Sequence, residues 1–77
     1  MQTKLIVLRK LNNVTQQELA DYLKITIKTY NKKEQGISKF TSDEMFALSV
    51  YFKRSLEDIF LPTTHQNGDI DAISLPN

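Results

Sequence analysis

The chain has no cysteine, no tryptophan and a single histidine, His65, among its 77 residues. Without cysteine it has no disulfide framework and no thiolate ligands for zinc. One histidine is too few for an imidazole metal site, so no metal or other cofactor is expected. A chain this short buries only about 60% of its unfolded surface. Its stability therefore has to come from a compact core.

Long apolar runs are also missing. The apolar stretch at residues 5–8 has four residues, far below the roughly 18 of a membrane span and the roughly 7–15 of a signal-peptide core. These absences predict a cytoplasmic protein with no membrane partner. An enzyme is not expected either, because the sequence shows no carboxylate pair, Ser–His–Asp set or Gly-rich phosphate loop.

Glycine and proline number two each, and three of these four residues lie within residues 62–77. Between residues 4 and 60 only Gly36 interrupts the chain, and strand-like alternation is absent from this part, which favours helices. Residues 62–77 are rich in Pro, Gly, Asn, Thr and Ser, a composition typical of a flexible tail. The sequence thus predicts a folded domain over residues 1–61 followed by a tail.

The net charge of +1 conceals an asymmetry. Residues 1–60 carry all ten basic residues and seven acidic ones, a net charge of +3, whereas residues 61–77 carry only two aspartates. Five of the basic residues are lysines between positions 24 and 39, where Glu34 is the one acid. A patch of this kind attracts polyanions such as nucleic acids, although a solvated helix face has the same composition.

Helix signals recur along the first half of the domain. Leu5, Leu8 and Leu11 follow i, i+3 spacing and define the inner face of a first helix over residues 3–11. Thr15 and Glu18 match a capping box that starts a second helix, which runs to about residue 23. Thr26 then caps a third helix over residues 27–35, which Gly36 terminates.

The second half of the domain repeats these signals. Thr41 and Glu44 match another capping box, which starts a fourth helix over residues 42–52. Ser55 caps a short fifth helix over residues 56–60. The pattern predicts a compact all-α domain of five helices. Phe46 and Tyr51 lie off the main apolar stripe of the fourth helix, which predicts an exposed apolar patch.

The second and third helices fit a helix-turn-helix, in which two short helices meet at a tight turn. The second of them has to enter a major groove about 12 Å wide, so its outer face must be free of bulky core residues. Its inner face must pack on the preceding helix. Residues 15–34 meet both demands, with Ala20 for close approach and with Ile25 and Tyr30 as apolar anchors.

The segment TQQELADYLKITIKTYNKKEQG, residues 15–36, resembles the lambda-repressor-like helix-turn-helix domains of the XRE family, which includes Cro and the small phage repressors. The ending SLEDIF, residues 55–60, resembles the family's fifth helix, and the likeness covers about residues 3–60. It implies a five-helix DNA-binding domain that acts as a Cro-like repressor, encoded by a phage or mobile element. Such a protein binds a palindromic operator in double-stranded DNA as a homodimer.

The resemblance also implies roles for individual residues. The positions that meet base edges are Ile27, Lys28 and Lys32. Those placed to contact phosphate are Gln16, Thr26, Thr29 and Lys39. Arg9 and Glu34 match a structural ion pair between the first and third helices. The alternatives are that the two base-facing lysines are ordinary surface residues and that Gln16 is a helix-terminal residue without a partner.

Two further hypotheses concern protein partners. Helices four and five build a dimer interface in this family, which assigns Phe46 and Tyr51 to an interface, with Ile70 and Ile73 of the tail as further contacts. The chain departs from the family pattern in three places, which are Lys24, Lys33 and Arg54. These departures keep a second function open, in which the chain pairs with a partner repressor and modulates its DNA binding.

Overall fold

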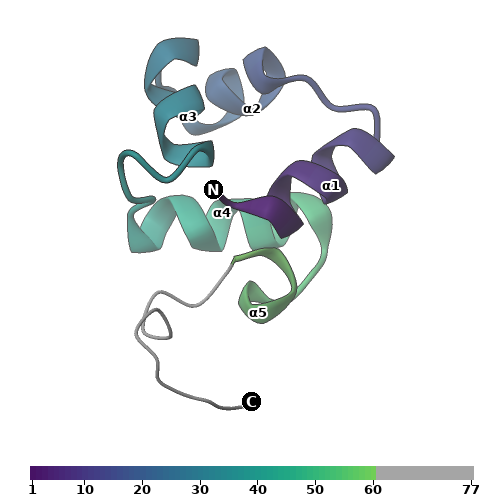
Figure 1. The fold of residues 1–77 in the computed structure, drawn as a ribbon. Helices are drawn as coiled ribbons and strands as arrows, with labels where there is room; N and C mark the ends of the chain where they lie inside the picture. The colour runs from purple at the N-terminus through teal and green to yellow at the C-terminus, as the bar shows by residue number, and fades with distance from the viewer. Residues whose placement is uncertain (61–77) are drawn as a thin grey trace.

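The computed structural model describes residues 1–60 of the chain, and these residues form five helices with no strand among them (Figure 1). The prediction of an all-α domain is confirmed. The predictions for residues 62–77, including those for Ile70 and Ile73, lie outside the described residues. The helices are α1 (Thr3–Leu11), α2 (Gln16–Leu23), α3 (Ile27–Glu34), α4 (Ser42–Phe52) and α5 (Leu56–Ile59).

Helices α2 to α5 begin where a hydroxyl side chain accepts a hydrogen bond from the backbone three residues further on. The capping residues are Thr15, Thr26, Thr41 and Ser55. Both predicted capping boxes are complete, because Glu18 and Glu44 accept in return from the backbone N–H of their capping residues. Helices α3 and α5 each end one residue earlier than predicted.

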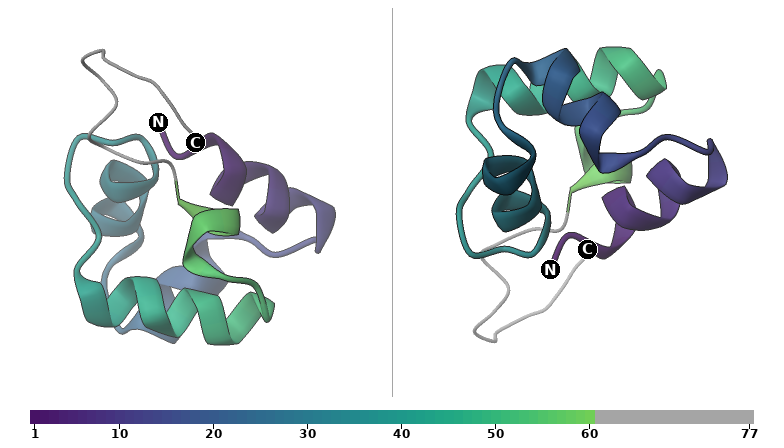
Figure 2. Two further views of the ribbon diagram at one scale, coloured as in Figure 1. Left: turned by 90° about the horizontal axis from the view of Figure 1, so that it is seen from below. Right: turned by 90° about the horizontal axis from the view of Figure 1, so that it is seen from above.

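The helices surround one core. Helices α2 and α3 pack against each other, α2 also contacts α4 through Tyr22, and α5 packs against both α1 and α4 (Figures 1 and 2). The core consists of Leu5, Leu19, Ala20, Tyr30, Phe40, Leu48, Ile59 and Phe60. The Phe40 ring makes edge contacts with Tyr30 and Phe60. Since helices of 4–11 residues are marginal alone, this shared packing stabilises all five.

One core prediction is wrong. Leu5 is fully buried and Leu8 is partly buried, but Leu11 is 76% exposed. The physical reason is the size of the neighbouring helix, because α5 has four residues and packs on the earlier turns of α1. Leu11, in the last turn of α1, is therefore not covered by α5.

Within residues 1–60, three residues other than glycine adopt left-handed backbone conformations, all in the connections between helices. They are Asn13, with φ 57°, Lys24, with φ 61°, and Lys53, with φ 56°. A left-handed conformation costs roughly 1–2 kcal/mol for a residue with a Cβ atom, and asparagine tolerates it best. The tight turn between α2 and α3 is thus built on Lys24 at a cost that the packing of the two helices offsets.

Candidate nucleic-acid interface

The turn between α2 and α3 sets the geometry of the candidate interface. The Ile25 N–H donates to the Ala20 carbonyl at 3.0 Å, and the Lys24 N–H donates to the Asp21 carbonyl at 3.1 Å. Ala20 is fully buried, so its small side chain allows the two helices to approach closely. Tyr30 is fully buried on the inner face of α3. The inner face of α3 is therefore fixed, and its opposite face is available to a partner.

The outer face of α3 begins with an exposed, mostly polar first turn. Thr26, Lys28, Thr29 and Lys32 are exposed, and Ile27 is 42% exposed. The Thr26 hydroxyl donates to the Thr29 hydroxyl oxygen at 2.9 Å and accepts from the Thr29 backbone N–H at 3.1 Å. The Thr29 hydroxyl accepts in this pair, so its own proton can be donated to a ligand. The three positions predicted to meet bases thus share one solvent-facing surface.

The ion pair expected between Arg9 and Glu34 is present at the opposite end of α3. Arg9 Nε lies 2.9 Å from Glu34 Oε2, and Arg9 Nη2 donates to Oε1 at 3.3 Å. The same carboxylate accepts from Gln16 Nε2 and from Tyr30 Oη, each at 2.7 Å. We call Arg9, Gln16, Tyr30 and Glu34 the Glu34 cluster. It joins α1, the start of α2 and the end of α3.

Charge and hydrogen bonding keep Glu34 ionised. Its burial alone would raise the pKa of the carboxyl group, but hydrogen bonds from Arg9, Gln16 and Tyr30, together with the Arg9 charge, outweigh burial and lower the pKa. Burial raises the pKa of the Tyr30 hydroxyl, and the hydrogen bond to Glu34 raises it further, so Tyr30 stays neutral. The cluster is a fixed structural element in which one carboxylate anchors three side chains.

Gln16 serves this cluster, although the resemblance assigns it to phosphate. Its Nε2 donates to Glu34, and its Oε1 accepts from Asn31 Nδ2 at 3.4 Å. A primary amide has two N–H groups, so one remains for a ligand. The side chain is partly buried at the start of α2. The structure therefore holds the Gln16 amide in one orientation at a helix N-terminus, where backbone N–H groups favour an anion.

Lys33 does not belong to the basic surface. Its ammonium group lies 2.6 Å from Glu44 Oε1 and 6.0 Å from the centre of the Phe40 ring. Burial opposes ionisation of Glu44, but hydrogen bonds from Lys33 and Thr41 and the Lys33 charge lower the pKa of its carboxyl group. The lysine that replaces an apolar residue of the family pattern thus has its charge neutralised inside the fold. The positive charge of this window is carried by Lys24, Lys28, Lys32 and Lys39, all exposed.

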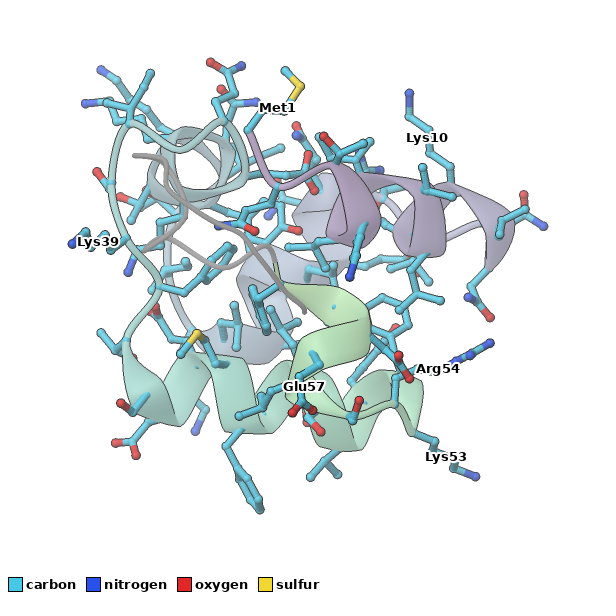
Figure 3. All side chains as sticks on the ribbon, turned by 60° about the horizontal axis from the view of Figure 1, so that its bottom comes forward. Met1, Lys10, Lys39, Lys53, Arg54 and Glu57 are labelled. Carbon is cyan, nitrogen blue, oxygen red and sulfur yellow. The ribbon has the colours of Figure 1, made fainter. Side chains whose placement is uncertain are left out.

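An open concavity of about 590 Å³ adjoins the first turn of α3. It lies between the end of α1, the start of α2 and Ile27, and Lys10, Asn13 and Gln17 line it. Lys10 and Lys39 extend from the body of the protein, from α1 and from the α3–α4 connection respectively (Figure 3). The sequence reasoning missed Lys10, Asn13 and Gln17. Gln17 is in the first turn of α2 and Asn13 is in the connection before it, whereas Lys10 lies beside this helix N-terminus only because α1 packs there.

Two of the residues predicted to form an interface, Phe46 and Tyr51, lie on α4. Phe46 is 67% exposed, and Val50, one turn further along, is 55% exposed. We call these two residues the α4 patch. Tyr51 is less available, because its ring makes edge contacts with Tyr22 and Phe52. The sequence reasoning missed Val50, although its i+4 spacing from Phe46 places it on the same helix face.

Two other kinds of site have no support in residues 1–60. None of the five helices is long and apolar enough to cross a bilayer. No group of three or more His, Asp or Glu side chains in this part of the chain is placed to hold a metal ion. The solvent-facing turn of α3, with the concavity beside it, is thus the chemically best defined surface of the described residues.

Comparison with known proteins agrees with this geometry. A family model described as helix-turn-helix matches residues 5–59, which includes all of α2 to α5 and most of α1. No curated protein and no solved structure matches the chain significantly. The matched model is the XRE type of helix-turn-helix, to which lambda repressor and Cro-like proteins belong, and it covers well over half of the chain. The chain therefore belongs to the XRE-type helix-turn-helix family of DNA-binding transcription regulators.

Proposed function

We propose that the protein is a Cro-like repressor that binds a palindromic operator by placing α3 in the major groove. The observation that carries this proposal is the division of α3 into two faces. Tyr30 and Glu34 fix one face to the domain, whereas Lys28 and Lys32 are exposed on the other. Because α3 is fixed on its inner face, the lysine ammonium groups on its outer face can donate to bases in the major groove while the helix keeps its place in the fold.

Each exposed group of α3 has a chemical counterpart in DNA. Lys28 and Lys32 donate to guanine O6 or N7, and Ile27 contacts a thymine methyl group. Thr26, Thr29 and Lys39 donate to phosphates, which orient the protein without reading sequence. The N-terminus of α2, with the remaining Gln16 N–H group, receives another phosphate. Lys10 and Gln17 line the same concavity and add contacts to that phosphate.

The symmetry of a palindrome requires two copies of the domain. We assign the self-association surface to the α4 patch and to the exposed edge of Tyr51, because these apolar groups face solvent. A twofold dimer of this type places two α3 helices about one helical turn of DNA apart, roughly 34–36 Å. Occupation of a promoter by the dimer then represses transcription, as in the small regulators of phages and mobile elements.

Selection of bound DNA from a random pool tests the proposal, because it yields both the sequence and the symmetry of the site. We expect a palindrome. Lys28→Ala should then lower the ratio of operator to random-DNA affinity, since a good base contact gives about 1–3 kcal/mol of discrimination. Lys39→Ala should weaken both affinities alike and reduce the salt slope by about one unit. Lys33→Met is the matched control, because its charge is paired with Glu44.

Failure to enrich any sequence would contradict the repressor proposal. An unchanged affinity ratio in Lys28→Ala would contradict the base-reading role of that residue. The α4 patch favours one second function, in which the domain pairs with a different repressor and modulates its DNA binding. A mobility-shift assay on the DNA upstream of its own gene, with and without a candidate partner repressor, distinguishes the two, because only the second function requires the added protein.

A further inference from the structure

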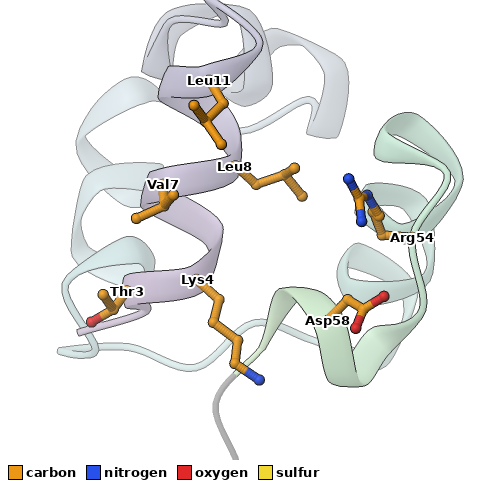
Figure 4. Close-up of a pocket in the computed structure, with 7 residues that line it drawn as sticks. All are labelled: Thr3, Lys4, Val7, Leu8, Leu11, Arg54 and Asp58. Carbon is orange, nitrogen blue, oxygen red and sulfur yellow. The ribbon is translucent and has the colours of Figure 1, made fainter.

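An apolar groove lies between α1 and the chain around Arg54 and Asp58, and none of its lining residues belongs to α2 or α3 (Figure 4). Its volume is about 310 Å³, and Val7, Leu8 and Leu11 of α1 form its apolar wall. Across the groove lie Arg54 and Asp58, and Lys4 stands at one end, where its ammonium group donates to the Glu57 carbonyl at 3.0 Å. The groove is thus apolar inside and bordered by two cations and one anion.

No part of residues 1–60 covers the apolar wall of the groove completely. Val7 is 51% exposed and Leu11 is 76% exposed, and they lie one turn apart on the same face of α1. Neighbouring exposed apolar side chains bordered by charged groups are a common feature of binding sites. Neither side chain contributes to the core or to the surface proposed for DNA. Their exposure is therefore better explained by a separate ligand that binds in the groove.

We propose that residues 69–75 of the same chain bind in this groove. The segment reads DIDAISL, so three apolar side chains, Ile70, Ile73 and Leu75, alternate with small or acidic ones. It is the one apolar cluster of residues 61–77 beyond Leu61, and that stretch carries two aspartates and no lysine or arginine. Its composition therefore complements both the apolar wall of the groove and the cations at its border.

The length of the connection allows this contact. Asp58 borders the groove and lies two residues before Phe60, where the described part of the chain ends. The ten residues from Phe60 to Ile70 span up to about 33 Å when extended, whereas the nine residues of α1 are only about 14 Å long. A short tether of this kind gives an effective concentration in the millimolar range. A weak contact is then sufficient for occupancy within one chain.

Charge favours the groove over the α4 patch as the site for this segment. The first turn of α4 is acidic, and Phe46 lies one turn after Asp43. An acidic segment bound at Phe46 would therefore be repelled by the negative charge of this turn. The groove border carries Lys4 and Arg54 against the single Asp58. The α4 patch remains free for a second copy, and the two surfaces have different occupants.

A spin label in the full chain tests the proposal directly. The chain has no cysteine, so Ser74→Cys provides a single attachment site for the label. This position lies between Ile73 and Leu75, and the substitution leaves both apolar side chains unchanged. A nitroxide at this position should broaden the amide signals of Val7, Leu8 and Asp58 several-fold more than those of Phe46 and Val50. Equal broadening at the two surfaces, or stronger broadening at the α4 patch, would overturn the proposal.

Two controls make the result specific. Leu11→Gln and Phe46→Gln each replace an exposed apolar side chain, so both labelled variants should keep the fold, as far-ultraviolet circular dichroism can verify. Leu11→Gln should remove the excess broadening in the groove, and Phe46→Gln should leave it. A mixture of labelled chains without ¹⁵N and unlabelled ¹⁵N chains should show no groove broadening. Broadening in the mixture equal to that in the labelled chain would assign the groove to a second copy and overturn the proposal.

Discussion

Replacement of Glu34 by alanine should destabilise the fold more than any substitution on the outer face of α3. Glu34 is only 2% exposed, and its carboxylate accepts four hydrogen bonds from three side chains. Alanine at this position leaves the Arg9 guanidinium buried with only the Val14 carbonyl as acceptor, at 3.0 Å. It also leaves the buried Tyr30 hydroxyl without its acceptor.

The magnitude follows from the burial of the pair. Removal of one partner of a buried ion pair costs about 3–5 kcal/mol, because the other charge stays uncompensated. At about 0.05–0.15 kcal/mol per residue, a folded unit of 60 residues has a total stability of roughly 3–9 kcal/mol. With a shift of about 4–8 °C per kcal/mol in a domain of this size, the thermal midpoint should fall by at least about 12 °C. Glu34→Ala should therefore be partly or largely unfolded at room temperature.

Urea and thermal unfolding, followed by circular dichroism, measure this effect. Glu57→Ala is the control, because this exposed carboxylate should change the free energy of unfolding by no more than about 0.5 kcal/mol. The double variant Arg9→Met/Glu34→Gln should be more stable than Glu34→Ala, since it removes the buried charge and keeps an acceptor for Tyr30. A free energy of unfolding for Glu34→Ala within about 1 kcal/mol of the unchanged protein would refute the reasoning.

Two further predictions use the same unfolding measurement. Lys24→Gly should raise the free energy of unfolding by about 0.5–1 kcal/mol, because glycine adopts the left-handed conformation of this position without the strain caused by a Cβ atom. Part of the gain is lost because glycine increases the conformational entropy of the unfolded chain. Lys10→Gly should instead lower the free energy of unfolding by about 1 kcal/mol, since Lys10 has a helical conformation in α1. A change of the same sign in the two variants would contradict this account. Stability should also fall on acidification. Because Glu34 and Glu44 have lowered pKa values in the fold, they contribute stability that is fully present above the unfolded value of about 4.5 and is lost as the pH falls through their folded values. Urea titrations between pH 7 and pH 3 should show this decline, and Glu34→Gln should make it shallower; an identical slope would exclude Glu34 as a source.

The helix boundaries were predictable because capping is a local interaction. Thr15 and Glu18, like Thr41 and Glu44, are three residues apart, so their reciprocal hydrogen bonds can be read from spacing alone. The inner face of α3 was predictable for a similar reason, since Tyr30 is an apolar group at a fixed position in the motif. Agreement between local signals and the overall fold is typical of sequences that specify one structure.

The side-chain partners were less predictable, because they depend on which helices meet. Lys33 counts as part of a basic window in the sequence, but α4 brings Glu44 to it and removes its charge from the surface. Gln16 has one of its N–H groups bound by Glu34, eighteen residues away. Leu11 follows the apolar spacing of α1, and only the short length of α5 leaves it exposed. No spacing rule within one helix contains this information.

The two faces of α3 separate the residues proposed to contact DNA from those that stabilise the fold. Lys28 and Lys32 are one turn apart, as are Tyr30 and Glu34, and the two pairs are offset by two residues. Two residues correspond to a rotation of about 200° around a helix with 3.6 residues per turn, so the pairs lie on nearly opposite sides. If α3 binds DNA as proposed, substitutions of the two lysines should therefore change which sequence it prefers without altering the Glu34 cluster. Substitutions in the cluster alter where the whole helix lies, and they should weaken binding to every DNA sequence alike.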